Sequence, residues 1–431
     1  MSLNIKNKNS SDRPSINEAP EGMTGPGYEH SSPIYANIRV AAGFLLMTLG
    51  TAAMYIGMVG LKPVALEFGI TRSLGALPYA LFMVGYGAGG IIFGRFADKF
   101  GIIIPLLIGS LCAPLGIYLA GISEYFWQYV LSLSILSGLL GSSVTFSPIV
   151  SDISHWFTAR RGLALSIVIS GSYFSGAIWP PIIQTMFDTY EWRIALQWIA
   201  LISLCSMIPL SLMFWRRPVH LNKLNSDHME KRFSKPLGFS PQTLQFGVCC
   251  AGIGCCIAMS MPQAHIVSYA TDLGFIAQRG AEMLSLMFGF GIISRLASGF
   301  ICDKIGGLKT VLFGSSLQCC AIVAFLGVDS LTGLYIISAC FGLSQGGIVP
   351  SYAVIIRTYF PPHEAGWRIG LALFSTIIGM AIGAWVAGKL FDITGSYTLS
   401  FVNALVFNII NLFIVGILVG RARRLDSGVQ Q

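Results

Sequence analysis

Charged residues are scarce in this chain. Asp, Glu, Lys and Arg together make up 11% of its 431 residues, whereas soluble domains carry about 25%. Hydrophobic residues make up 54%, and the mean hydropathy is +0.70. A soluble chain of this length cannot bury so much apolar surface. The composition therefore excludes an ordinary soluble protein and indicates a protein of the membrane.

Patterns for metal, disulfide and nucleotide chemistry are also missing. The ten cysteines lie mostly in apolar runs, with no C-x-x-C pair and no histidine cluster at metal-ligand spacing. Buried, reduced cysteines are the better interpretation. No phosphate-binding loop supports transport driven by ATP, and no nucleophile–base pair stands out. We therefore predict neither an enzyme nor a bound metal or cofactor.

The first 36 residues are polar and lack the apolar core of a signal peptide. We predict a disordered cytoplasmic tail over 1–36, followed by a hydrophobic segment that stays in the membrane. From Arg39 onward, charges separate twelve apolar runs, each close to the ~20 residues that cross a bilayer. These runs cover residues 40–61, 73–94, 100–123, 125–151, 162–187, 194–215, 244–271, 281–301, 310–328, 330–356, 369–388 and 393–420.

The longest polar stretch inside the chain, Arg216 to Lys235, divides these runs six and six. The predicted fold class is an all-α membrane protein of twelve transmembrane helices in two six-helix halves. The predicted domains are an N-terminal half over 37–215, a cytoplasmic linker over 216–243, a C-terminal half over 244–420 and a cytoplasmic tail over 421–431.

Positive charge is distributed unevenly about these runs. Of the 27 Lys and Arg residues, 21 fall on the side that holds both termini, and Arg295 falls within a span. Five fall on the other side, namely Lys62, Arg72, Arg193, Arg279 and Lys389. Because positive loops stay inside, both termini are predicted to be cytoplasmic, in the cell membrane. The net charge of +8 then reflects topology, and nucleic-acid binding is not predicted.

The two halves repeat with an offset of 205 residues. Glu67-Phe68-Gly69 matches Asp272-Leu273-Gly274, and the segment 94–101 matches 299–306 at Gly, Asp, Lys and Gly. A constant offset over several helices indicates internal duplication. Arg295 departs from the repeat, because its counterpart is Gly90.

Arg295 is an arginine inside an apolar helix. It lies ~20 Å along the helix from Glu282 and ~12 Å from Asp303, which together span about the ~30 Å of a bilayer core. Snorkelling to the surface is the plain alternative for a long side chain. A buried guanidinium usually faces a cavity or a partner, and can hold a carboxylate with two parallel hydrogen bonds.

The segments Gly94–Gly101 and Gly299–Gly306 resemble the signature loop of the major facilitator superfamily. This resemblance implies the fold predicted above and a cytoplasmic latch. The residues expected to act in gating are Asp98, Lys99, Asp303, Lys304, Arg160 and Arg161. In the first loop, Ile102–Ile104 occupy positions that are usually partly basic, which weakens the latch expected of the N-terminal half.

Three further segments resemble the monocarboxylate transporter and oxalate–formate exchanger branch of this superfamily. They are Trp156–Gly171, Leu61-Lys62-Pro63 with Glu67-Phe68-Gly69, and His265–Gly274. The resemblance makes Arg295 the anchor for a substrate carboxylate, with Lys62 as a second substrate-binding candidate. It departs from the animal members at Gly291, where they carry an aspartate one turn before the arginine. If transport is coupled to protons, His265 or the substrate itself must then carry the proton, and His265 is the candidate for proton coupling.

The expected function is secondary transport of a small organic anion, a monocarboxylate, by alternating access and with proton coupling as an option. Anion exchange and efflux of an amphiphile remain alternatives, as does a non-transporting membrane sensor on the same fold. The expected partners are the anion, protons and the lipid bilayer, and the chain is expected to be a monomer.

Overall fold

The structure is a computed structural model and describes residues 33–157, 161–215 and 236–428. Within these ranges every regular element is a helix, and twelve helical spans are long and apolar enough to cross a membrane. The predicted class and number of spans are therefore confirmed. Residues 1–32 of the predicted tail and 216–235 of the predicted linker lie outside the described residues.

Six spans form the N-terminal half. Its helices are α1 (Pro33–Gly50), α2 (Ala52–Val59), α3 (Leu61–Glu67), α4 (Arg72–Gly75), α5 (Leu77–Phe100), α6 (Ile103–Gly121), α7 (Phe126–Leu131), η1 (Ser132–Gly141), η2 (Ser142–Thr145), α8 (Ser147–Trp156), α9 (Arg161–Thr189) and α10 (Trp192–Leu212).

Six more spans form the C-terminal half. Its helices are η4 (Pro236–Gly238), α11 (Pro241–Asp272), α12 (Ala277–Ile305), α13 (Gly307–Phe325), α14 (Leu331–Gln345), α15 (Ile348–Tyr359), α16 (Pro362–Thr394) and α17 (Thr398–Gly428). The last helix continues past residue 420, where the sequence predicted its end, and the first begins at Pro33.

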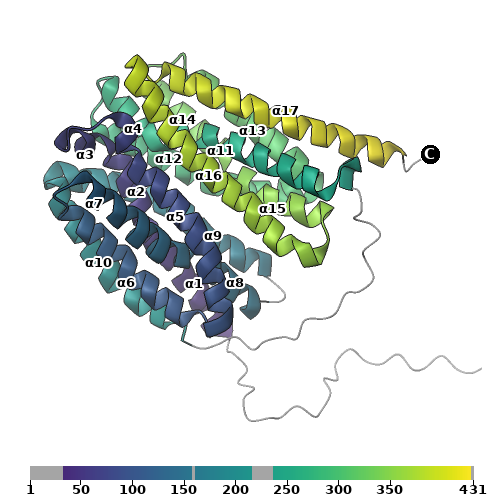
Figure 1. The fold of residues 1–431 in the computed structure, drawn as a ribbon, viewed down its shortest axis with the longest axis horizontal. Coiled ribbons are helices and arrows are strands. Elements are labelled where there is room, and N and C mark those ends of the chain that lie inside the picture. The colour runs from purple at the N-terminus through teal and green to yellow at the C-terminus, as the bar shows by residue number, and fades with distance from the viewer. Residues whose placement is uncertain (1–32, 158–160, 216–235, 429–431) are drawn as a thin grey trace, which may run out of the picture.

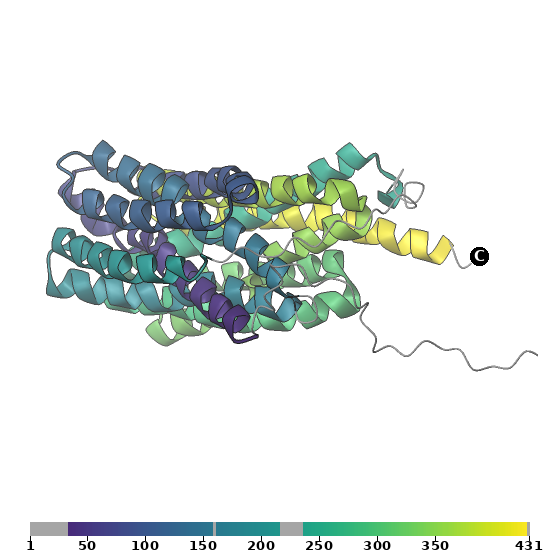
Figure 2. The same cartoon turned by 90° about the horizontal axis from the view of Figure 1, so that it is seen from below.

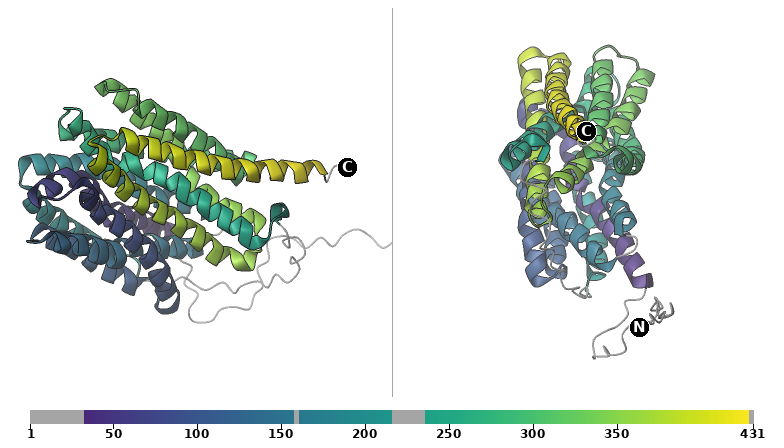
Figure 3. Two further views of the ribbon diagram at one scale, coloured as in Figure 1. Left: turned by 45° about the horizontal axis from the view of Figure 1, so that its top comes forward. Right: turned by 90° about the vertical axis from the view of Figure 1, so that its right-hand side faces the viewer.

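The helices of the two halves form two adjoining groups, drawn purple to teal and green to yellow (Figure 1). An even number of spans returns the chain to the side where it started. We call the end where α1 begins and α17 ends the terminal end, and the opposite end, with α3 and α4, the distal end (Figure 1). Figure 3 shows the same two groups of helices from two further sides. The helix α17 reaches beyond most of its neighbours at the terminal end (Figure 2).

The halves meet mainly where α9 packs on α12 and where α4 and α5 pack on α16. Glycines permit this close approach. A Cβ on Gly87 would lie 3.0 Å from the ring of Phe374, and one on Gly388 would lie 2.9 Å from the carbonyl oxygen of Arg72. A larger residue at Gly388 would meet backbone atoms, which cannot turn aside as a side chain can.

The backbone keeps the 205-residue repeat that the sequence shows. Gly69 and Gly274 both have positive φ angles, of 61° and 91°, and Gly101 and Gly306 have angles of 86° and 82°. Such angles favour glycine because a Cβ would clash with the backbone. Each pair turns the chain at the corresponding place in its half, so the duplication extends to the local conformation.

Two corresponding spans are interrupted near their middle. The fourth passes from the π-helix η1 through the 3-10 helix η2 into α8, and the tenth breaks at Gly346–Gly347 between α14 and α15. With the 205-residue offset, Ser142 corresponds to Gly347. Interrupted helices within the membrane are common where transporters bind substrates. Both breaks therefore direct attention to the middle of the bundle.

Candidate functional site

Arg295 lies on α12 where the two halves face each other. It follows Ala277, at the distal end of the helix, by ~27 Å and precedes Ile305 by ~15 Å. Its guanidinium carbon is 4.9 Å from the centre of the Tyr173 ring on α9, in the other half. The side chain is partly buried and keeps some accessible surface. This places Arg295 inside the span, at the interface between the halves.

Within the described ranges, no acid forms an ion pair with Arg295. The group found over its guanidinium is the uncharged Tyr173 ring. A charge within a membrane span is costly, about 2.5–3.5 kcal/mol on insertion scales, and normally has a partner. The guanidinium is therefore able to accept an anionic ligand, and a carboxylate fits its planar fork.

Two aromatic rings pack into glycines across the interface beside Arg295. A Cβ on Gly291 would lie 2.6 Å from the Tyr173 ring, and the Phe288 ring fills the corresponding space at Gly176. The rings of Tyr173 and Phe288 lie edge to face, with centres 5.7 Å apart. Each half thus inserts one ring into a glycine of the other, which holds α9 against α12.

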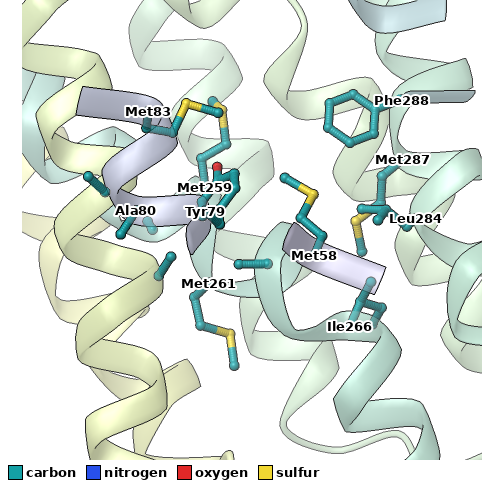
Figure 4. Packing of buried hydrophobic residues seen from close by; sticks show 14 of the residues in the cluster. Met58, Tyr79, Ala80, Met83, Met259, Met261, Ile266, Leu284, Met287 and Phe288 are labelled. Carbon is teal, nitrogen blue, oxygen red and sulfur yellow. The ribbon is translucent and has the colours of Figure 1, made fainter. Parts of the chain in front are cut away.

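Methionines pack between the halves on the distal side of Arg295. Met58 on α2, Met83 on α5, Met259 and Met261 on α11 and Met287 on α12 are at most 4% exposed. Figure 4 shows these side chains gathered with Tyr79 and Phe288. Met287 precedes Arg295 by ~12 Å along α12. Because methionine adapts its shape to its surroundings, this cluster fills the space between the halves without requiring a rigid fit.

Ion pairs tie the halves together at the distal end. The Lys62 Nζ lies 2.9 Å from Oδ1 of Asp272, and Nη2 of Arg72 donates to both oxygens of Asp272, at 2.9 and 3.1 Å. Asp392 accepts hydrogen bonds from the backbone N–H groups of Arg72 and Ser73, at 2.8 and 3.0 Å. We call Lys62, Arg72, Asp272 and Asp392 the distal lock.

Lys62 was predicted to bind substrate, and the structure places it in the distal lock. Its ammonium group also donates to Thr271, at 2.9 Å. Asp272, its partner, ends α11 at the distal end, whereas Arg295 lies ~27 Å from the distal end of α12. The structure therefore does not bring Lys62 and Arg295 together, and Lys62 is engaged with an acid of its own.

His265 is fully buried on α11 within the C-terminal half. One ring nitrogen, Nε2, lies 2.8 Å from the Ala384 carbonyl oxygen, and Nδ1 lies 3.1 Å from the Tyr397 hydroxyl. A neutral imidazole satisfies both partners by donating from Nε2 to the carbonyl and accepting from the hydroxyl. This pairing is what a structural histidine needs, and it leaves neither nitrogen directed at Arg295.

Three of the six predicted gating residues have side chains that the structure describes, and they lie at the terminal end. Lys99, Asp303 and Lys304 are exposed, and no ion pair of Asp303 is found in the described part of the chain. The side chains of Asp98 and Arg161 are not described, and Arg160 lies outside the described residues. Among described residues, hydrogen bonds between the halves lie on the distal side, from the distal lock to the bond between Ser285 and Ala177.

Sequence reasoning missed most of the distal lock. It assigned Arg72 only to a side of the membrane and gave no role to Asp272 or Asp392. One signal was available, because Asp272 replaces the Glu67 of the first repeat at a position that turns the chain. The pairing itself could not be found, since it joins residues 200 positions apart in different halves.

A pocket of about 120 Å³ lies on the other face of α12 and does not include Arg295. It is bounded by α12, α13 and the break between α14 and α15. Its lining is mostly apolar and includes Ile293, Ser298, Phe313, Leu317 and Leu343. It offers no charged group to an anion, so the candidate site remains the interface at Arg295.

Sequence comparison places the chain in a family. It matches the Major Facilitator Superfamily over residues 41–366 and 247–430, and the chain belongs to this family of membrane transporters. It is 25% identical over 360 residues to Monocarboxylate transporter 13 of Rattus norvegicus, covering 79% of this chain and 82% of that protein. It is 24% identical over 336 residues to a riboflavin transporter of Saccharomyces cerevisiae, covering 73% and 64%.

Solved structures show the same fold. A bacterial homologue of the lysosomal transporter Spinster, in an inward-facing and unoccupied conformation, aligns with a TM-score of 0.68 at 13% identity, over 91% of this chain and 98% of that one. A POT family transporter in complex with 5-aminolevulinic acid aligns with a TM-score of 0.71 at 12% identity, over 90% and 96%. The predicted superfamily is confirmed.

Proposed function

We propose that this transporter moves a small monocarboxylate across the cell membrane by alternating access, with Arg295 as the anchor for the carboxylate. The observation that carries this proposal is a guanidinium within a membrane span that has no acidic partner among the described residues. An anion that binds there neutralises the site, so the halves can enclose the site in the apolar interior at a lower cost.

The number of cations near Arg295 indicates how many carboxylates the substrate carries. A dicarboxylate needs a second positive group at the site. The run from Ile369 to Gly388 on α16 contains no charge, and Lys62 is engaged in the distal lock. One fixed guanidinium best matches one carboxylate. Similarity to a protein named as a monocarboxylate transporter supports the same substrate class.

The contacts between the halves indicate which end of the transporter is closed. The distal end is closed by ion pairs and methionines, and the hydrogen bonds that join the halves within the described ranges lie on that side. With the terminal end as the cytoplasmic one, as the distribution of Lys and Arg predicts, this is an inward-facing state. We further propose that the chain works as a monomer.

The test is uptake of labelled lactate-sized and succinate-sized acids into proteoliposomes, with and without unlabelled acid inside. Wild type should favour the monoacid, and faster uptake into preloaded vesicles would identify exchange. Arg295→Ala should lower uptake to background, and Arg295→Lys should keep the charge but lose the fork and most activity.

Arg279→Gln is the matched control, because Arg279 lies on the same helix and pairs with Glu282 at 3.0 Å. It should retain uptake. Full uptake by Arg295→Ala in vesicles that reconstitute as well as wild type would overturn the anchor, and preference for the diacid would overturn the valence.

A further inference from the structure

One turn before Arg295 on α12, the position that neighbours it is a glycine, Gly291. Positions four apart on a helix are neighbours, so an acid at 291 would pair with Arg295. The chain has glycine there, and the space that a Cβ would take is filled from the other half by the Tyr173 ring, 2.6 Å from the ideal Cβ position. The same ring lies against the guanidinium, with its centre 4.9 Å from the guanidinium carbon.

We propose that Tyr173 is the positioning residue for Arg295, and that Gly291 is required because it admits the ring. An aromatic face attracts a cation without neutralising it. Tyr173 therefore holds the guanidinium fork in place and leaves its full charge for the substrate carboxylate. This inference rests on the proposed role of Arg295 as the substrate anchor.

A carboxylate at 291 would act differently. It would also hold Arg295 in place, but the acid and the guanidinium together would be neutral. A substrate anion that bound to this neutral pair would give the site a net negative charge unless a proton bound with it. With a ring in that place, the substrate anion supplies the neutralising charge itself. The site in this chain therefore binds the anion without taking up a proton.

The ring is itself fixed by its neighbours. Tyr173 packs edge to face on Phe288, whose ring fills the space at Gly176, so both rings are held by the contact between α9 and α12. Because α9 and α12 belong to different halves, Arg295 is oriented only while these helices stay together. The inference thus gives the aromatic pair a role in substrate affinity as well as in packing.

The first test measures KM and turnover of monocarboxylate uptake. Tyr173→Leu should raise KM about two- to thirtyfold, the range expected for loss of a cation–aromatic contact, with turnover changed less. Tyr173→Phe keeps the ring and should stay near wild type. Gly291→Ala should raise KM because the ring must move, but should have no further effect in the Tyr173→Leu background.

Gly289→Ala is the matched control on the same helix, since its Cβ would lie 4.0 Å from Ala177 and should be tolerated. The double variant Gly291→Asp with Tyr173→Leu supplies the second readout. It replaces the ring by an acid, and its monocarboxylate uptake should become strongly favoured by acidic pH compared with wild type. A packing defect alone would not produce this change.

Two results would overturn the inference: an unchanged KM in Tyr173→Leu, or an equal effect of Gly291→Ala with and without the ring. If Arg295→Ala abolishes uptake while Tyr173→Leu does not change it, only the positioning role fails. If Arg295→Ala transports normally, the proposed anchor fails first, and the Tyr173 result then describes packing alone.

Discussion

The two halves have the same plan but differ at the positions that bear charge. Arg295 corresponds to Gly90, Asp272 to Glu67 and His265 to Gly60. Glu67 pairs within its own half, with Arg193 at 2.8 Å and with the Trp192 indole N–H. Asp272 instead pairs with Lys62 and Arg72 of the other half. The repeat gives the two halves a common scaffold, the proposed anchor Arg295 stands in one copy alone, and the distal lock takes residues from both copies.

Space alone does not explain the difference at the site. A Cβ on Gly90 would have only Ser147 within 4 Å, at 3.7 Å, so a side chain could begin there. One cation in one half suffices to bind one carboxylate, whereas a second would leave the empty carrier with two buried charges. The comparison therefore indicates that the proposed binding site depends on asymmetry in charge between two halves of similar backbone.

The largest difference between the halves is expected at the corresponding acids Asp272 and Glu67. Asp272→Asn removes two ion pairs that join the halves, each worth about 0.2–1 kcal/mol when partly exposed to solvent. The population with an open distal end should rise about two- to thirtyfold. Glu67→Gln breaks pairs within one half and should not change that population.

The measurement is the distance between spin labels at Leu66 and Ile276, which are 74% and 66% exposed at the distal end, in a background cleared of reactive cysteines. The Asp272→Asn protein should show a longer distance in a larger fraction of molecules. An equal response in Glu67→Gln would remove the distinction between the two halves.

A smaller effect is expected at the paired loops of the terminal end. Asp303→Asn should destabilise the state in which the terminal end is closed. A cysteine placed at Gly90 should then react faster with a membrane-impermeant reagent added from the terminal side. Asp98→Asn should act more weakly, because Ile102–Ile104 replace the basic residues that a latch needs. A larger response at Asp98 would reverse this ranking of the halves.

The smallest effect is expected at His265. The glutamine amide has an NH2 group that can donate to the Ala384 carbonyl and an oxygen that can accept from the Tyr397 hydroxyl, so His265→Gln can keep both bonds. Uptake should remain within about twofold of wild type, with the same dependence on pH between 5 and 8. His265→Ala, which leaves these partners unsatisfied, should lower thermal stability by the ~1–3 kcal/mol typical of such a loss. Loss of pH dependence in His265→Gln would restore His265 as the proton carrier.

The sequence by itself determined the class of fold. An apolar run of about 20 residues that crosses a bilayer forms a helix, because lipid cannot hydrogen-bond its N–H and C=O groups and the helix pairs them internally. The 205-residue repeat predicted the two halves, and the turns at Gly69, Gly274, Gly101 and Gly306 keep the same offset in the structure. Arg295 could be singled out for the same reason, since a charge in an apolar run is costly wherever the helix packs.

Only the tertiary structure decided what each charge meets. Lys62 was expected near the substrate, but a lysine at the end of a helix pairs with whichever acid the other half presents, here Asp272. The contact of Tyr173 with Gly291 joins residues 118 positions apart and depends on how α9 crosses α12. Helix pattern and charge spacing are local properties, whereas the rotation of one helix against another is set by the packing of the whole bundle.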